Sequence, residues 1–307
     1  MKVDVLLGSY NGEGYIREQI DSILGQSFKN ISLLIRDDGS TDETVNIIRE
    51  YSSKDSRVKI IEDNKMSKGV GENFKSLLLN SNSDYVLFSD QDDIWFPEKV
   101  ETLVNFAEEN FNENLPSIVY SSGLIVDSKL NETGNITDKK LSISSIGDML
   151  ISNGGVQGCA ILMNKALSNS LKESSDKFFW HMHDQVATLF AASFGSIFYL
   201  PKPLFLYRQH GSNVKGYHRK DFTSLFKKSL NIDFIVENKS FQLFVDFYNF
   251  YESKLTHKQA KLINSFINLK GKRKFLFLIF LVRNKINLSK SLMRGLVKSV
   301  LAKKIYE

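Results

Sequence analysis

The first hundred residues alternate short apolar runs with segments in which apolar residues recur every three or four positions. The runs predict strands at 3–7, 31–35, 58–61 and 85–88, and the recurring patterns predict helices at 15–24, 40–51 and 72–79. The second helix would open with a capping box formed by Ser40 and Glu43. Strands that alternate with helices pair in parallel through right-handed crossovers. The pattern therefore predicts an α/β fold, Rossmann-like, with a mostly parallel sheet flanked by helices.

The pattern becomes less regular after Pro97, which is placed to be the first residue of a helix. Strand-like segments follow at 117–121, 159–163, 197–200 and 204–207, with a polar loop at 127–142 and a helical segment at 183–192. Beyond Asp221 the sequence turns helical, aromatic and basic. We therefore expect one α/β domain at 1–220 and a helical extension at 221–307.

Charge separates these two parts. The chain has a net charge of +5, yet residues 221–307 hold 17 Lys and Arg against 6 Asp and Glu, so the tail carries +11 and residues 1–220 carry −6. Between Lys272 and Lys304 ten basic residues occur without an acidic one. Such a segment suits anionic lipid or phosphate, although a solvated basic helix without a partner has the same composition. We expect contact with an anionic membrane and no nucleic acid partner.

A single cysteine, Cys159, excludes an internal disulfide and a Cys-rich metal site. The residue is expected to be a small buried filler, and a reducing cytoplasm is the natural compartment. The first apolar run contains Asp4 and turns at Gly8, which indicates a strand and not a secretory signal. The longest apolar run, 275–282, is shorter than the roughly 20 residues of a membrane-spanning helix. These features predict a cytoplasmic protein that lies peripherally at the inner face of the cell membrane.

Polar residues follow three of the predicted strands. They are Ser9-Tyr10-Asn11, Asp37-Asp38-Gly39-Ser40 and Asp90-Gln91-Asp92-Asp93. In doubly wound sheets the ligand lies at the carboxyl ends of the strands, so these three segments are candidates for the site. No Gly-x-Gly-x-x-Gly follows the first strand and no Gly-x-x-x-x-Gly-Lys-Ser/Thr occurs, so dinucleotide dehydrogenases and P-loop enzymes lose their main support.

The most acidic of these segments is Asp90-Gln91-Asp92-Asp93. Clustered carboxylates hold hard divalent cations, which bridge the oxygens of a diphosphate. Because Asp90 and Asp92 alternate at a strand end, their side chains can point to one side. An acidic turn that caps the helix beginning at Pro97 is the structural alternative.

The combination of motifs carries a resemblance. The sequence contains Ser9-Tyr10-Asn11-Gly12, then Arg36-Asp37-Asp38-Gly39-Ser40-Thr41-Asp42, then Phe88-Ser89-Asp90-Gln91-Asp92-Asp93-Ile94-Trp95. In this order and spacing they resemble family 2 of the inverting glycosyltransferases, which have the GT-A fold, and in particular its rhamnosyltransferase-like branch. The resemblance covers about residues 3–215. It implies a nucleotide-sugar half at about 1–100 and an acceptor half at about 101–220, with the basic tail outside it.

The resemblance also implies which residues surround the donor. The nucleotide-sugar residues would be Ser9, Tyr10, Asn11, Glu13, Asp37, Asp38, Lys68, Asn73, Asp90, Gln91 and Arg208. Tyr10 would lie beside the base, either Asp37 or Asp38 would hydrogen-bond the pyrimidine ring, and Lys68 and Asn73 would lie near the phosphates or ribose. Asp90 and Asp92 match the family's Asp-x-Asp element, which implies a Mg²⁺ or Mn²⁺ ion bound directly by Asp92.

His210 lies in a segment, Arg208-Gln209-His210, that is similar to one near the donor in related enzymes. The resemblance implies that His210 is a third metal ligand or a diphosphate contact, with Arg208 as its cationic neighbour. A structural histidine is the alternative.

An inverting transfer needs a carboxylate that takes the proton of the acceptor hydroxyl. In the family this residue opens a helix after the acceptor segment, and Asp184 occupies that place; its structural alternative is a helix N-cap. The neighbouring His181 and His183 also fit the start of a binuclear metallohydrolase motif, but the further His and Asp ligands that such a site needs are lacking. His183 is expected beneath Asp184. The other residues placed in the acceptor region are Trp95, Gln157 and Gly158, with core packing as the alternative for Trp95.

The end of the chain has an amphipathic pattern. Apolar residues recur at Leu288, Leu292, Leu296 and Val300, with Met293, Val297 and Leu301 beside them, while Lys290, Arg294 and Lys298 share another face. Such a basic amphipathic helix suits the headgroup region of a membrane, and packing on the rest of the chain or on a partner is the alternative.

Together these features predict a metal-dependent bacterial enzyme that transfers a sugar from a nucleotide-sugar to a glycan or lipid-linked acceptor in cell-surface polysaccharide synthesis. The branch favours dTDP-rhamnose as donor, and UDP-hexoses remain open. The alternative from a different class is a non-catalytic subunit that binds nucleotide-sugar or glycan within a transferase complex.

Overall fold

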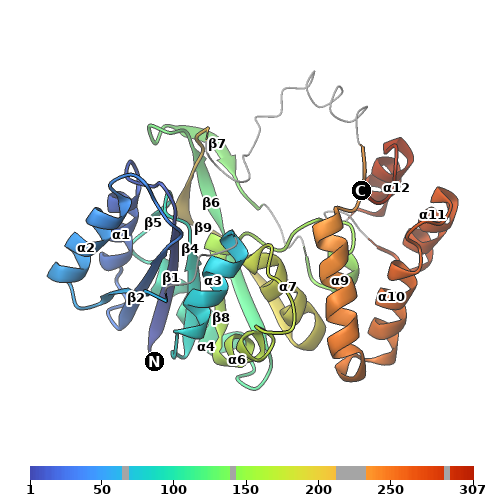
Figure 1. Cartoon of the computed structure of the whole chain (residues 1–307), viewed down its shortest axis with the longest axis horizontal. Coiled ribbons are helices and arrows are strands. Elements are labelled where there is room, and N and C mark those ends of the chain that lie inside the picture. Colours follow the sequence, from blue (N-terminus) through green and yellow to red (C-terminus); the bar gives the residue numbers. More distant parts are fainter. Residues whose placement is uncertain (64–68, 139–142, 212–232, 287–290) are drawn as a thin grey trace.

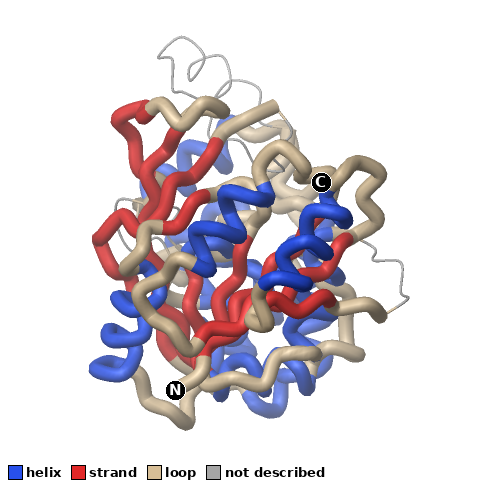
Figure 2. Tube along the Cα trace, turned by 90° about the vertical axis from the view of Figure 1, so that its left-hand side faces the viewer, coloured by secondary structure: helices blue, strands red, loops and turns tan. Residues whose placement is uncertain are grey.

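The computed structural model describes residues 1–63, 69–138, 143–211, 233–286 and 291–307. Within these residues the strands form one sheet with helices on its faces, and the C-terminal helices stand together at one end (Figure 1). Figure 2, turned by 90°, shows the strands between helices on either side.

The N-terminal half is the predicted parallel sheet. Its strands, β1 (Val3–Ser9), β2 (Ile31–Asp37), β3 (Val58–Ile60) and β4 (Tyr85–Ser89), lie in the order β3-β2-β1-β4. Helices α1 (Ile16–Leu24), α2 (Thr44–Lys54) and α3 (Val70–Leu79) connect them. Every residue of β1 except Gly8 is buried, because helices cover both faces of a parallel sheet.

The second half extends the sheet with mixed pairing. Strand β8 (Ile161–Asn164) is antiparallel to β4, β6 (Ser117–Val126) is antiparallel to β8, and β9 (Ser196–Arg208) is parallel to β6. The short β5 (Ile94–Trp95) pairs with β9, and β7 (Glu132–Ile136) pairs with β6. The helices here are α4 (Lys99–Asn110), α5 (Ile146–Met149), α6 (Lys165–Glu173) and α7 (His183–Phe194).

Several local predictions were wrong. The segments at 197–200 and 204–207 form one strand, β9, which continues across two prolines where its register with β6 shifts. The predicted polar loop contains β7. Helix α4 begins at Lys99, two residues after Pro97. No capping box opens α2, because the Ser40 hydroxyl donates to Asp37 instead.

The C-terminal helices pack on the α/β core. They are α9 (Asn238–Tyr251), a 3₁₀ turn η2 (Glu252–Lys254), α10 (His257–Ile267), α11 (Lys274–Arg283) and α12 (Leu292–Leu301). The Phe190 ring of α7 lies 5.4 Å from Phe247 and 5.2 Å from Tyr251 of α9. The boundary predicted near residue 220 lies outside the described residues, so it stays a prediction. Among the described residues, no helix has the length and hydropathy that crossing a membrane requires.

Candidate functional site

The three polar segments meet at the carboxyl ends of β1, β2 and β4. Strand register places Ser9 beside Asp37, and the Ser9 hydroxyl donates to the Asp37 carboxylate at 2.9 Å. The backbone N–H of Asn11 donates to the Ser40 hydroxyl at 2.8 Å. The predicted convergence of these segments is therefore observed.

The Asp37 carboxylate accepts hydrogen bonds from neighbouring residues of the site. One carboxylate oxygen accepts from the hydroxyls of Ser9 and Ser40 at 2.9 and 2.5 Å, and the other accepts from the N–H groups of Gly39 and Ser40 at 2.9 and 2.7 Å. These bonds shape the turn after β2 and occupy both oxygens. The other candidate for the base contact, Asp38, keeps 18% of its side-chain surface exposed and lies 3.7 Å from the Arg36 guanidinium.

Gln91 holds the turn after β1. Its side-chain amide accepts from the Tyr10 N–H and donates to the Tyr10 carbonyl, both at 2.9 Å. A Cβ on Gly12 would lie 2.2 Å from the Gln91 Oε1, so a side chain there would displace this amide. Gln91 therefore positions the turn at Tyr10, and its contact with the nucleotide-sugar stays a prediction. Tyr10 itself is 56% exposed at the mouth of the site.

Asn11 and Glu13 also join loops to one another. The Asn11 side chain accepts from the Thr41 N–H at 2.8 Å, and the Glu13 carboxylate accepts from the Glu43 N–H at 2.9 Å ahead of α2. Asn11 has a left-handed backbone, φ 47°, which asparagine tolerates better than most residues. Both polar side chains thus bind the loop after β2 rather than face away from the fold.

The Asn73 side chain lies inside the fold. It is buried, and its amide accepts from the Arg36 guanidinium at 3.1 Å and donates to the Arg36 carbonyl at 3.3 Å. Both ends of the amide thus position Arg36, and the place of Asn73 near the phosphates or ribose stays a prediction. Lys68, the other residue expected there, lies outside the described residues.

A second cluster joins the acidic motif to the end of β9. The His210 Nε2 lies 2.7 Å from the Asp92 Oδ2, and the His210 ring stacks on Tyr15 at 4.5 Å. The buried Arg208 donates from Nε to the Asp92 carbonyl at 3.0 Å and forms an ion pair with Glu18. The sequence did not single out Tyr15 and Glu18, because in the helical pattern at 15–24 they look like ordinary residues of an amphipathic helix. In the structure Tyr15 is the N-cap of α1 and Glu18 lies in its first turn.

Asp90 lies among like charges. Burial, followed by the charges of Asp92 and Asp184, raises the pKa of the Asp90 carboxyl to about 7. The proposed metal-binding strand end and the proposed base are therefore near enough to interact electrostatically, although Asp184 lies 92 positions after Asp92 along the chain. Excess carboxylate of this kind is typical of sites that take up a cation.

Two sets of side chains are candidate ligands for a cation here. Ligand atoms of Asp90, Asp93 and Cys159 lie within 4.8 Å of one another, but Cys159 is buried and burial raises the pKa of its thiol well above the usual value. A neutral thiol is a poor ligand for Mg²⁺ or Mn²⁺, which prefer oxygen. Asp92 and His210, whose Oδ2 and Nε2 lie 2.7 Å apart, offer a carboxylate oxygen and an imidazole at the partly exposed side of the motif, and with Asp90 they are the ligands that the sequence predicts. An Asp-rich site that suits a metal ion is thus present.

Asp184 lies in the first turn of α7 and is 8% exposed. The N-cap of this helix is Met182, so the capping alternative for Asp184 was wrong. A Cβ on Gly155 would lie 2.4 Å from the Asp184 carbonyl oxygen. The backbone at Gly155 therefore approaches the start of α7 closely and helps to fix Asp184.

His183 packs beneath Asp184, as predicted. Its ring lies 3.7 Å from Phe74 and 4.5 Å from Phe88, and burial lowers its pKa to about 3, so the imidazole is neutral. A Cβ on Gly158 would lie 2.6 Å from its Nε2. His183 and Gly158 thus pack against one another under the start of α7, and their place in the acceptor region stays a prediction. Gln157, just before Gly158, is partly exposed.

Trp95 belongs to the core. It is 2% exposed, and its ring lies 3.6 Å from the Nζ of Lys99. This burial agrees with the packing alternative, and an acceptor contact of Trp95 stays a prediction. Burial lowers the pKa of the Lys99 ammonium to about 7, against the opposing charges of Asp93 and Asp90.

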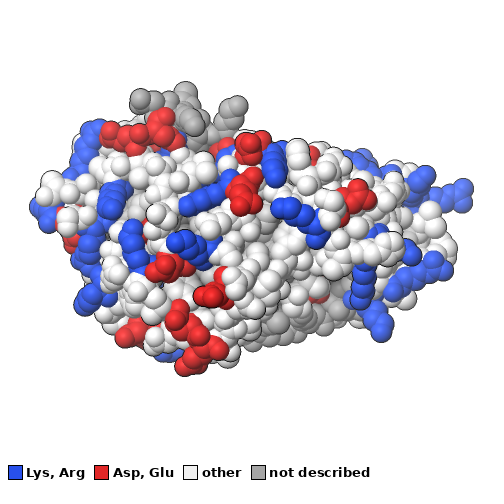
Figure 3. Space-filling view, turned by 90° about the horizontal axis from the view of Figure 1, so that it is seen from below, with Lys and Arg blue, Asp and Glu red and all other residues white. Residues whose placement is uncertain are grey.

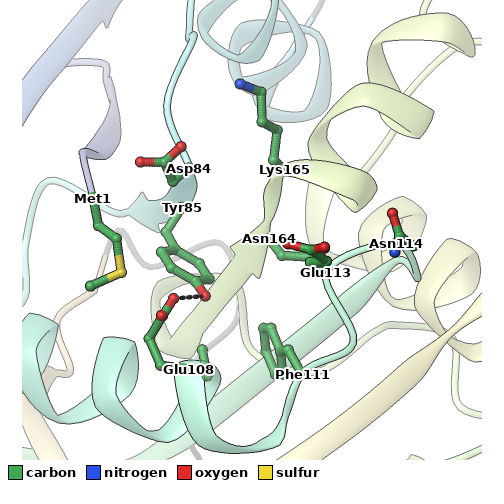
Figure 4. A pocket seen from close by; sticks show the side chains of 10 residues that line it. Met1, Asp84, Tyr85, Glu108, Phe111, Glu113, Asn114, Asn164 and Lys165 are labelled. Carbon is green, nitrogen blue, oxygen red and sulfur yellow. Dashed lines mark hydrogen bonds between the residues drawn. The ribbon is translucent and has the colours of Figure 1, made fainter.

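A surface cavity of about 650 Å³ lies away from this site (Figure 4). Its lining includes Asp84 and Tyr85 at the amino end of β4, and the Tyr85 hydroxyl donates to Glu108 at 2.6 Å. The acidic motif follows the opposite end of the same strand, so this cavity is not the donor site.

Comparison with known proteins agrees with this geometry. The dTDP-rhamnosyl transferase RfbG of Shigella flexneri is 33% identical over 223 residues, which are 68% of this chain and 73% of that protein. The putative glycosyltransferase EpsE of Bacillus subtilis is 40% identical over 110 residues, 36% of this chain and 39% of that protein.

Solved structures share the fold. The crystal structure of S. aureus TarS 1–349 in complex with UDP-GlcNAc has a TM-score of 0.58 and 18% identity, and the match covers 97% of this chain and 79% of that one. The match to the longer TarS chain covers 43% of it. The model of the family described as Glycosyl transferase family 2 matches residues 4–171, more than half of the 307 residues. This chain therefore belongs to glycosyl transferase family 2.

Proposed function

We propose that the chain transfers a sugar from a nucleotide-sugar to a glycan or lipid-linked acceptor, with inversion, in cell-surface polysaccharide synthesis. The observation that supports this most is that carboxylates from distant segments act on one another, since the charges of Asp92 and Asp184 both contribute to the raised pKa of Asp90. A transfer of this kind needs one group to receive the acceptor proton and others to manage the charge of the leaving diphosphate.

The favoured donor is dTDP-rhamnose. RfbG, a relative of similar length, is described as a dTDP-rhamnosyl transferase, whereas the TarS structure holds UDP-GlcNAc. Both donors carry a pyrimidine, for which Asp38 is the proposed reader, with the exposed Tyr10 beside the base. UDP-hexoses are therefore the second donor class to test.

Asp184 would accept the proton of the acceptor hydroxyl. As that proton leaves, the hydroxyl oxygen bonds to the anomeric carbon from the face opposite the diphosphate, and the bond from this carbon to the diphosphate oxygen breaks. Asp90, Asp92 and His210 would hold a Mg²⁺ or Mn²⁺ ion, which when bound supplies positive charge for the leaving diphosphate. Arg208, fixed by Glu18 and the Asp92 carbonyl, orients this strand end.

A donor-hydrolysis assay tests the proposal. The full chain is incubated with dTDP-rhamnose, UDP-galactose, UDP-glucose or UDP-N-acetylhexosamines, with Mg²⁺ or Mn²⁺, and nucleoside diphosphate release is measured. We expect release to be fastest with dTDP-rhamnose and to stop when EDTA removes the ion. Turnover of no donor with either ion would contradict the proposed activity, and preference for a UDP-sugar would contradict the rhamnose assignment.

We also propose that the chain works at the inner face of a membrane through the ends of α11 and α12. Lys274 at the start of α11 donates to the carbonyls of Val300 and Ala302 at 2.6 and 2.5 Å, so these two helix ends share a corner. Phe275 is 68% exposed there and Val300 59%. The exposed basic residues next to them are Lys272, Arg273, Lys303 and Lys304.

This corner combines apolar and basic side chains as a bilayer surface requires. Lys and Arg gather at the end of the molecule formed by the C-terminal helices, where few Asp or Glu are visible (Figure 3). Of the predicted amphipathic helix, residues 288 and 290 lie outside the described residues. On the described part, Val297 and Val300 face outward, so packing on the core does not cover this side of α12.

Vesicle co-sedimentation measures this contact. Phe275→Glu should lower binding of the full chain to phosphatidylglycerol vesicles at least about tenfold, since burying one phenylalanine contributes about 1.5–3 kcal/mol. Phe250→Glu on α9, also exposed but outside this corner, is the matched control and should bind as the unchanged chain does. Equal binding of both variants would remove the membrane proposal.

A further inference from the structure

Lys99 is a fully buried lysine that no step above uses. It is the first residue of α4 and its exposed fraction is 0%. Lysine is almost never buried in this way unless its charge is compensated, because the ammonium loses its hydration. The groups that surround the Lys99 ammonium therefore indicate the role of this residue.

Electron-rich groups surround the Lys99 ammonium. Nζ donates to the Cys159 carbonyl at 2.6 Å and lies 3.6 Å from the ring centre of Trp95 and 4.4 Å from that of Phe205. Trp95 and Phe205 are directly paired residues of β5 and β9, so the two rings form one wall. A carbonyl and two ring faces attract a cation, so these groups oppose the burial that lowers the pKa of the Lys99 ammonium.

The acidic motif lies near this ammonium, because ligand atoms of Asp90 and Asp93 lie within 4.8 Å of the Cys159 Sγ and the Cys159 carbonyl accepts from the Lys99 Nζ. Asp93 is 1% exposed, and among the described residues its Oδ2 has no hydrogen-bond partner. The charges of Asp93 and Asp90 both act on Lys99. Asp92 turns the other way, toward His210. Within the motif, Asp90 and Asp93 therefore interact with Lys99, whereas Asp92 faces His210 on the side proposed for the nucleotide-sugar.

We propose that Lys99 is a positioning residue for the acidic motif. It supplies the buried positive charge near Asp90 and Asp93 and ties the motif to the turn at 158–160 and to β9. Without this charge, mutual repulsion of the carboxylates would displace Asp90 and Asp92 from the arrangement that receives the cation. The inference rests on the proposed function, because it assumes that these two residues bind Mg²⁺ or Mn²⁺.

Lys99→Met tests the proposal, because methionine keeps the length of the side chain and removes its charge and donors. The probe is Mn²⁺ binding to the full chain in the presence of dTDP, measured by electron paramagnetic resonance of the free ion. Affinity should fall about 10- to 100-fold, as is typical when a group that supports metal ligands is removed. Lys99→Arg, which keeps the charge, should stay within about threefold of the unchanged chain.

Lys202→Met is the matched control. Lys202 lies on β9, 48% exposed and 3.7 Å from Glu98, the neighbour of Lys99, so its replacement should leave Mn²⁺ affinity unchanged. Tryptophan emission gives an independent readout: in a Trp180→Phe background, Lys99→Met should change the emission of Trp95 by removing the adjacent cation.

The outcomes separate this inference from the function on which it rests. Absence of Mn²⁺ binding by the unchanged chain would contradict the proposed metal dependence. Equal Mn²⁺ affinity of the unchanged chain and folded Lys99→Met would overturn the role of Lys99. If Lys99→Met does not fold, a folded Lys99→Arg decides: near-normal affinity supports the charge role, and a loss beyond tenfold overturns it.

Discussion

Asp184→Asn is expected to reduce kcat for sugar transfer by about 10²- to 10⁴-fold, the usual contribution of a positioned general base. Asparagine has the shape of aspartate, and its oxygen can still accept the bond that the Asp184 Oδ1 takes from the Gln185 N–H at 2.7 Å. The helix start and the contact with Gly155 should therefore persist. The measurement is steady-state transfer to acceptor, with thermal unfolding and donor affinity recorded in parallel.

Donor affinity should change little in this variant, because Asp184 acts on the acceptor hydroxyl. The matched control is Asp176→Asn, an exposed residue in the loop before α7, which should transfer at the normal rate. Unchanged transfer by Asp184→Asn would reject it as the base. Donor binding without any transfer by the unchanged chain would favour the non-catalytic subunit.

Asp92→Asn is expected to lower transfer about 10²- to 10³-fold in saturating Mg²⁺ or Mn²⁺. The amide would keep the shape of the carboxylate and can still bond to His210, now 2.7 Å from Asp92, but it lacks the charge that binds a divalent ion. The ion contributes several kcal/mol to stabilising the leaving diphosphate, and each 1.36 kcal/mol corresponds to tenfold in rate. Transfer rates measured against ion concentration report the loss.

Asp84→Asn controls for this experiment, because Asp84 immediately precedes β4 at its other end. It removes the same charge beside the opposite end of this strand, far from the site, and its Oδ2 accepts the N–H of Lys2 at 2.8 Å. Transfer by this variant should be normal. If Asp92→Asn kept full activity and its response to the ion, the assignment of Asp92 as a metal ligand would be wrong.

Much of the fold could be predicted from the sequence. The four parallel strands of the N-terminal half lie where alternating apolar runs and helical patterns placed them, because burial between two helix layers requires continuous apolar strands. The mixed second half was harder. β5 has only two residues and β7 is exposed or half-buried, so neither leaves an apolar signature.

The sequence predicted which segments form the site, and the structure shows which contacts their side chains make. Asp37 and Gln91 at strand ends and Asn73 on α3 were all candidates for ligand contacts, yet in the structure their side chains form hydrogen bonds within the fold. Trp95 and His183 proved to be core residues. The type of a residue shows which hydrogen bonds its side chain can donate or accept. It does not show whether the partner is a ligand or another part of the fold.

The sequence by itself determined the family, the α/β class and the collection of carboxylates at strand ends, because these follow from local pattern and motif spacing. Only the tertiary structure decided how those residues are used. Arg208 bonds to Glu18 across 190 positions, and the Lys99 ammonium meets Cys159 across 60. The α9 helix packs its aromatic side chains on α7, beside the proposed base, instead of forming a detached tail. Such pairings are set by the burial and charge of groups that the fold brings together, and no local pattern encodes them.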